Sequence, residues 1–254
     1  MKKLLFFGLI FSLFACNPKP DSVEPLPVSD DRTVGIEMQY VFDTQPLLMS
    51  QISNNTGQNT IGFSNIQHYL SDLKLKKADG SWIAVKGYGL LSPSSNSKAS
   101  FAFQGVPKGI YEGIRFTIGV DSITNHSDPS IWPNSHALSI MTGGSMHWTW
   151  NSGYIFIKVE GQYEIPGSTP GGFAYHLGRD DLNVSYTQEG INLNLQENGI
   201  TAVFKMDLKQ FFIQPNAFTI SPETSFTHSG PRDTIAEQLY ENMQNMVTFI
   251  ELKP

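Results

Sequence analysis

The chain has 254 residues, and its 17 Lys and Arg side chains against 23 Asp and Glu give a formal net charge of −6. This acidic balance argues against a nucleic-acid partner, because binding to phosphates needs clustered Lys and Arg. The single cysteine, Cys16, excludes a disulfide within the chain.

The first fifteen residues have the features of a bacterial lipoprotein signal peptide. A positively charged start precedes the apolar run Leu4 to Phe14, which is shorter than the roughly 20 residues that a membrane-spanning helix needs. Leu13-Phe14-Ala15-Cys16 then resembles a lipobox. We therefore expect residues 1–15 to be removed and Cys16 to carry the lipid anchor. The alternative is an ordinary secretory signal that contains a cysteine.

Residues 16–31 are expected to form a flexible tether between the lipid and the folded domain. Four prolines lie among mostly polar residues here, and such a segment cannot bury enough apolar surface to fold. Loss of residues 1–16 removes Lys2 and Lys3 and no acid, so 15 basic and 23 acidic side chains leave a net charge of −8. We expect one domain over residues 32–254, anchored in the cell envelope at the outer membrane, on a face that the sequence leaves open.

Short strands dominate this domain. Apolar residues alternate with more polar ones from Val34 to Phe42, a pattern typical of a half-buried strand, and turn residues separate the later runs. About ten such strands predict an all-β fold, mainly an antiparallel β-sandwich. The expected strands cover residues 34–42, 65–77, 82–85, 99–103, 111–120, 154–163, 173–177, 182–186, 191–195 and 201–206.

One helix is expected near the C-terminus. Thr234 and Glu237 resemble a capping box, and a shorter helix is expected over residues 207–212. The apolar stripe of the C-terminal helix is expected to be a packing surface. Its members recur at helical spacing at Ile235, Leu239, Met243, Met246 and Ile250.

The stretch from Asp121 to Asn151 has no clear periodicity. Loops of this length are uncommon in compact domains and tend to be functional or disordered. Because disordered loops rarely carry many aromatic side chains, we expect a folded, functional loop. It contains half of the histidines and most of the tryptophans, with two methionines: His126, His136, His147, Trp132, Trp148, Trp150, Met141 and Met146.

No enzyme signature is present in the sequence. A nucleophile elbow, a phosphate-binding glycine loop and a zinc-protease helix are all missing, so we expect a non-enzymatic protein. Asp121 and Asp128 could ligate a hard cation, but their spacing favours ordinary turn residues. His136 and His228 lie in polar, Ser-flanked stretches and are expected to be exposed.

Met146-His147-Trp148-Thr149-Trp150 is the segment with the densest functional side chains. An extended backbone would place Met146, Trp148 and Trp150 on one face and His147 on the other. The residues alone leave open whether the tryptophans fill space between sheets or belong to a site. His126 and His176 are likewise either ordinary polar residues or metal ligands.

Taken in order, several segments resemble the MbnP-like copper-binding proteins, which are related to copper-repressible surface proteins of methane-oxidising bacteria. The resemblance spans residues 33–210. Its matching elements are Tyr69 to Leu75 with the turn Asp79-Gly80, Ile118 to Asp121, Asn125 to Pro129, Met146 to Trp150, Asn151 to Phe156 and Tyr175 to Gly178.

The resemblance implies a β-rich domain that holds one copper ion through His126 and His176. It also implies that a tryptophan, either Trp148 or Trp150, is oxidised to a kynurenine that joins the site. A di-haem enzyme of the cytochrome c peroxidase type would be the partner in that oxidation.

Met146 and His147 are further candidates for this site, although the family pattern leads us to expect an aromatic residue in place of His147. Imidazole suits copper and thioether sulfur suits Cu(I), while the oxidation state stays open. Since function does not follow from fold, two alternatives remain. One is a glycan- or ligand-binding module that uses Trp148, Trp150 and Tyr154 as a stacking platform, and the other is a structural surface lipoprotein. Nitrogens of His126 and His176 facing a common point would favour copper.

Overall fold

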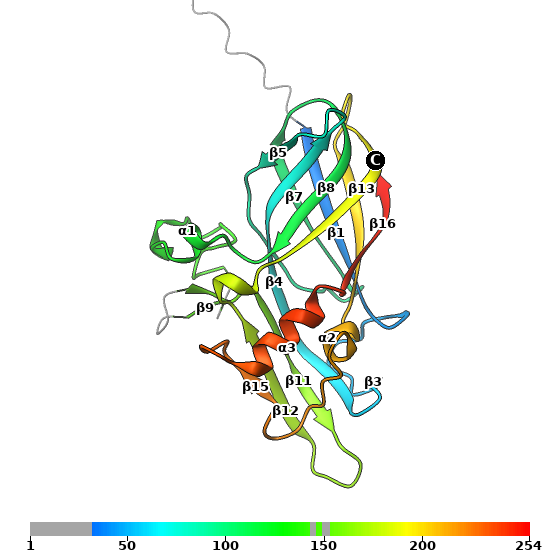
Figure 1. Cartoon of the computed structure of the whole chain (residues 1–254), viewed down its shortest axis with the longest axis vertical. Helices are drawn as coiled ribbons and strands as arrows, with labels where there is room; N and C mark the ends of the chain where they lie inside the picture. Colours follow the sequence, from blue (N-terminus) through cyan, green and yellow to red (C-terminus); the bar gives the residue numbers. More distant parts are fainter. Residues whose placement is uncertain (1–31, 143–145, 149–152) are drawn as a thin grey trace, which may run out of the picture.

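The computed structural model describes residues 32–142, 146–148 and 153–254 (Figure 1). The expected signal peptide, Cys16 and the tether therefore lie outside the described residues, as does Trp150. Within the described part of the chain, no helix has the length and apolar character needed to cross a membrane.

Two large β-sheets form the body of the domain, beside a two-stranded sheet in the long loop, and the prediction of a β-sandwich with a C-terminal helix is confirmed. The smaller sheet has the order β16-β14-β1-β2, with β7 also pairing with β1. It consists of β1 (Arg32–Phe42), β2 (Gln45–Pro46), β7 (Lys98–Val106), β14 (Ile200–Asp207) and β16 (Val247–Lys253). The strands are mostly antiparallel, but β1 and β14 run parallel.

The larger sheet has the order β13-β8-β4-β11-β12-β15, and three short strands pair with β4. Its long members are β4 (Thr60–Lys77), β8 (Ile110–Ile118), β11 (Ile157–Glu164), β12 (Gly171–Leu177) and β13 (Val184–Asn194). Its short members are β3 (Asn54–Asn55), β5 (Trp82–Val85), β6 (Gly89–Leu91) and β15 (Phe226–Thr227).

The main core lies between the sheets and continues under two helices, α2 (Gln210–Ile213) and α3 (Thr234–Met243). In Figure 1 these helices lie beside β11 and β12, below the end of the smaller sheet. Phe212 of α2 packs its ring against Phe173 and Tyr175 of β12. The helices thus cover the part of the larger sheet that the smaller one leaves open, and β12 is held between them and β11.

The C-terminal helix is shorter than the sequence pattern predicts. It ends at Met243, and residues 247–253 form β16, which pairs with the edge of β14 and leaves Ile250 exposed. As a strand, this segment gives hydrogen-bond partners to the edge of β14, which a continued helix would leave unpaired. The N-cap is Asp233, whose side chain accepts from Ala236 N, so the expected capping box at Thr234 is wrong by one residue.

Two further boundaries differ from the prediction. Residues 182–186 and 191–195 were expected as separate strands, but β13 joins them through a register shift against β8. The short helix over 207–212 begins later, because Asp207 still belongs to β14.

The long loop after β8 is folded over its described residues. It contains α1 (Ser122–Asn125), the 3₁₀ turn η1 (Pro129–Ile131) and β9 (His147–Trp148), which pairs with β10 (Gly153–Tyr154). Its apolar side chains form a second, smaller core with Tyr69 of β4. The members of this core are Tyr69, Val120, Leu138, Met146, Trp148, Tyr154, Ile155 and Phe156. The loop therefore has a fixed position against the larger sheet.

Candidate functional site

A group of polar side chains lies on the face of β11 and β12 that points away from the main core. Val159 and Tyr175 face the core, so their neighbours Lys158, Glu160 and His176 face the other way. Lys158 and His176 are direct cross-strand partners. The strand alternation thus places a base, an acid and an imidazole on one surface.

His176 is fixed through both ring nitrogens. Its Nε2 lies 2.7 Å from Glu160 Oε1, and its Nδ1 lies 3.1 Å from Nδ1 of His228. Asn65 of β4 donates to the other carboxylate oxygen of Glu160 at 2.9 Å. Because an ionised carboxylate only accepts, Glu160 holds the proton of His176 on Nε2. The lone pair of His176 Nδ1 then faces His228.

His228 reaches this position from a distant part of the chain. β15 pairs in parallel with β12, with Thr227 opposite Tyr175, so the following residue lies beside His176. Ser229 Oγ also donates to the main-chain oxygen of His176 at 2.8 Å. Phe226 and Trp148 both present their rings edge-on to the His228 imidazole, with centroid distances of 4.4 and 6.2 Å.

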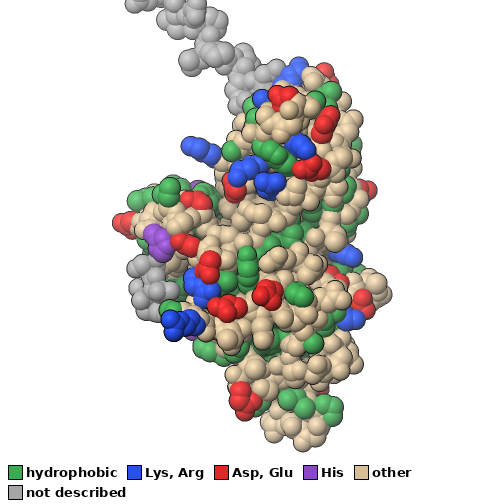
Figure 2. Space-filling view, viewed as in Figure 1, with side chains coloured by type: hydrophobic (Ala, Val, Ile, Leu, Met, Phe, Trp, Pro, Cys, Tyr) green, Lys and Arg blue, Asp and Glu red, His purple; other side chains and the backbone are tan. Residues whose placement is uncertain are grey.

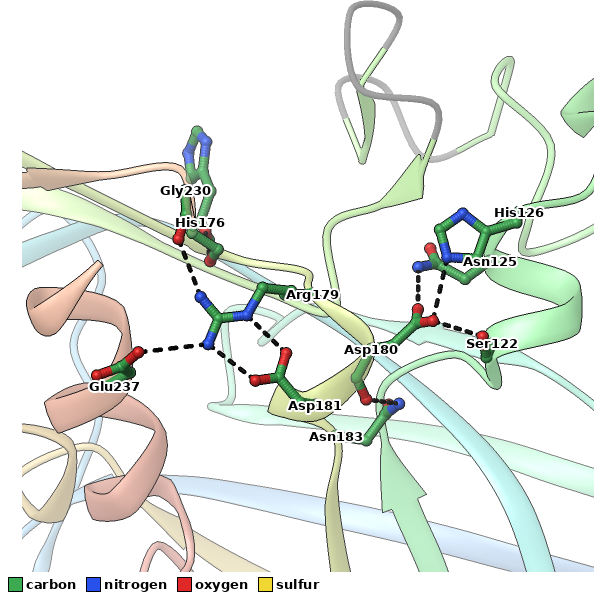
Figure 3. Close-up of polar contacts among 11 residues, drawn as sticks. Ser122, Asn125, His126, His176, Arg179, Asp180, Asp181, Asn183, Gly230 and Glu237 are labelled. Carbon is green, nitrogen blue, oxygen red and sulfur yellow. Dashed lines mark hydrogen bonds and ion pairs between the residues drawn. The ribbon is translucent and has the colours of Figure 1, made fainter. Parts of the chain in front are cut away.

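His126 lies in a different part of the site. It is the C-cap of α1, its side chain is 60% exposed, and its Nε2 lies 3.0 Å from Asp180 Oδ2. Asp180 also accepts from Ser122 and Asn125, which ties the loop to the turn after β12. In Figure 3, His126 and His176 lie on opposite sides of Arg179 and Asp180.

A cleft of about 330 Å³ links the two regions, because both His126 and His228 line it. Arg179 and Asp180 form part of its wall. Arg179 is engaged by Asp181 and by the main-chain oxygen of Gly230 (Figure 3). On the flank of the molecule below α1, histidine, acidic and basic side chains gather at the surface (Figure 2).

The loop residues that the sequence singled out fall into two groups. Met146 and Trp148 are buried in the second core, whereas His147 is half-buried and packs its ring against Tyr154 at 4.8 Å. This alternation agrees with the extended backbone expected for the segment. Asp121 and Asp128 cap α1 and η1, so each acts as a turn residue.

Burial keeps the imidazoles of the site neutral. Desolvation lowers the pKa of both His176 and His228 below the usual value, and the positive charge of Lys158 acts in the same direction. Burial alone would raise the pKa of Glu160, but hydrogen bonds from Asn65 and His176 outweigh it and leave that pKa lowered. At neutral pH the site therefore contains a carboxylate and two uncharged imidazoles.

This arrangement fits a metal that accepts imidazole ligands. Two nitrogens bound to one ion at about 2.0 Å lie about 2.8 to 4 Å apart for angles between 90° and 180°. The Nδ1 atoms of His176 and His228, at 3.1 Å, are within that range. A carboxylate behind one imidazole is the usual second partner of a metal-binding histidine. Within residues 32–142, 146–148 and 153–254, however, no group of three His, Cys, Asp or Glu side chains is placed to hold a metal ion.

Sequence reasoning chose His126 and His176 and missed His228. The structure brings His176 together with His228 and shows His126 bonded to Asp180. His136 and His228 were both expected to be exposed, but both are half-buried. The ring of His136 stacks on Trp132 with the ring planes 8° apart. The only local signal for His228 is that it follows Phe226-Thr227, which is too short a run to predict a strand.

Comparisons with known proteins give a family and a fold. The MbnP family profile matches residues 31–229 of the chain. MbnP from Methylosinus trichosporium has a similar solved structure, with a TM-score of 0.56 and 15% sequence identity over 83% of this chain and 87% of that one. No curated protein sequence matches significantly.

Proposed function

Because the chain belongs to the MbnP family, we propose that it is a non-enzymatic copper-binding lipoprotein of the cell envelope. Cys16 would hold it at the outer membrane, and residues 16–31 would let the domain stand off the lipid. The copper would be held by imidazole nitrogens at the end of β12.

The observation that carries this proposal is the facing pair of Nδ1 atoms of His176 and His228. The pair lies 3.1 Å apart, and Glu160 fixes the tautomer of one partner. Neutral nitrogen donors suit copper, and when bound the ion would supply a one-electron redox centre. His176 is thus retained from the sequence prediction, and His228 is proposed as the second ligand.

We propose that His126 lines the cleft and is not a copper ligand. Its Nε2 is already bonded to Asp180, and it is exposed, whereas His228 lines the same cleft and also contacts His176. Single mutations distinguish this proposal from the sequence-based prediction, in which His126 is the second ligand.

The test is a competition titration with a Cu(I) chelator on four single variants. His176→Ala and His228→Ala should each lose most of the affinity. His126→Ala should keep it, and His136→Ala is the matched control, since that ring stacks on Trp132 away from the pair. If His126→Ala loses the affinity and His228→Ala keeps it, the ligands are His126 and His176, as predicted from the sequence. Equal affinities across all four variants would remove copper from this site.

Trp148 is the candidate for conversion to a kynurenine that the pair itself supports, because its ring is edge-on to the His228 imidazole with the centroids 6.2 Å apart. Trp150 stays the second candidate. Peptide mass analysis of protein purified from its native host should find the mass change of kynurenine formation at Trp148, which is the gain of one oxygen with the loss of one carbon. An unmodified mass at both tryptophans would reject the kynurenine and leave copper binding intact.

A di-haem peroxidase-type partner for that oxidation would need a docking surface near the cleft. The loop that carries His126 exposes Ile123, Ile131 and Met141, and this loop is our proposed contact surface for such a partner. The alternative of an aromatic stacking platform has less support, because Trp148 and Tyr154 are buried.

The anchor has a separate test. Cys16→Ser should release the protein from membranes while its thermal unfolding stays unchanged, because the tether is expected to lie outside the core. Retention of the variant in the membrane fraction after a carbonate wash would show that the anchor is wrong.

A further inference from the structure

Lys158 is a buried cation beside the histidine pair. Its side chain is 1% exposed, and among the described residues it is the only Lys or Arg that is buried. Burying a charged group costs much free energy unless nearby charges compensate it. Because the dielectric constant is low in such a place, a buried cation acts strongly on the groups that pack beside it.

The position of Lys158 relates it to both histidines. It is the direct cross-strand partner of His176 and lies two residues from Glu160 on the same face of β11. Its charge acts on His228 as well as on His176, since it contributes to lowering the pKa of both. Burial lowers the pKa of Lys158, and the carboxylate of Glu160 opposes that shift by stabilising the ammonium group.

We infer that Lys158 sets the oxidation-state preference of the site, by disfavouring Cu(II) relative to Cu(I). The inference rests on the proposed function. A divalent ion bound by the two neutral imidazoles carries one more unit of charge than a monovalent ion. The nearby ammonium repels the divalent ion twice as strongly as the monovalent one. The Glu160 carboxylate attracts both ions and opposes this repulsion, so removing the ammonium isolates the contribution of Lys158.

The size of the effect follows from Coulomb's law. At an effective dielectric constant of about 20, Coulomb's law gives roughly a fifty-fold change in affinity per extra unit of charge for an ammonium about 7 Å from the ion, and roughly a ten-fold change or more at about 10 Å. Lys158 should therefore shift the ratio of the Cu(II) and Cu(I) dissociation constants by that factor. The effect is on binding and needs no enzymatic readout.

The experiment measures both dissociation constants by chelator competition on full-length protein. A pH of about 8 keeps the imidazoles neutral, since free histidine titrates near 6.5. In Lys158→Met, Cu(II) binding should tighten relative to Cu(I) by roughly ten- to fifty-fold. Lys205→Met is the matched control, because Lys205 lies on β14 in the other sheet and its loss changes the net charge equally. Its ratio should equal that of the wild type.

Each outcome decides a different question. An unchanged ratio in Lys158→Met overturns the role of Lys158 while copper binding stands. A wild-type protein that binds neither ion refutes the proposed function itself. If Lys158→Met does not fold, Lys158→Gln retains a polar head group and should show the same shift.

Discussion

The buried histidine of the main core makes the stability of this protein sensitive to acid. His68 is fully buried on the inner face of β4, and its Nε2 lies 2.8 Å from the hydroxyl of Tyr40. Burial lowers its pKa to about 4. In the unfolded chain the same group titrates near 6.5, so between these values the unfolded state binds more protons. Stability is therefore lost as pH falls from about 6.5 towards 4, and this residue alone accounts for about 2 kcal/mol between pH 7 and pH 5.

Urea denaturation at pH 7 and pH 5 measures this effect. In His68→Gln, the side chain can still accept from Tyr40 but does not titrate, so the loss of unfolding free energy should be smaller by about 2 kcal/mol. His176 and His228 contribute their own pH dependence to both proteins, and the comparison cancels it. His136→Gln is the control for removing a half-buried imidazole. Equal losses in the wild type and His68→Gln would refute the reasoning.

Three further outcomes follow from the site. Asn125→Ala should lower the unfolding free energy by about 1–3 kcal/mol in urea denaturation, because it leaves the buried N–H of Tyr154 without its 2.7 Å acceptor. Gly178→Ala should destabilise by about 1–3 kcal/mol and change tryptophan fluorescence, since its Cβ would lie 2.3 Å from Tyr154 O and 2.6 Å from the Trp148 ring. Copper affinity should stay constant as pH falls to about 6.5 and weaken below that value. The lowered pKa values of His176 and His228 keep both rings neutral down to that pH. A chelator titration in which the affinity already falls above about pH 6.5 would contradict this.

The long strands were predictable because their signal is local. In β1 the side chains from Val34 to Phe42 alternate between core and surface, and the sequence carries the same alternation. The end of α3 was not predictable in this way. Met246 and Ile250 continue the helical spacing, but the free edge of β14 recruits residues 247–253 as a strand. That choice depends on a partner more than forty residues earlier in the chain.

The site was only half predictable for a similar reason. His176 stands out in the sequence as a polar residue between apolar strand neighbours. His228 becomes its partner only through the parallel register of β12 and β15, across a sequence separation of 52 residues. His126 looked equivalent to His176 because its bond to Asp180, across a sequence separation of 54 residues, is also a long-range feature.

The two imidazoles are held with unequal rigidity, and this bears on how an ion would reach them. His176 belongs to a strand that is hydrogen-bonded on both sides and is fixed by Glu160. His228 follows a two-residue strand at the edge of the sheet and lines the cleft. Short edge segments open at lower free-energy cost than central strands. If copper binds as proposed, His228 is the ligand that an ion in the cleft meets first, and its movement can adjust the 3.1 Å separation while His176 keeps its place.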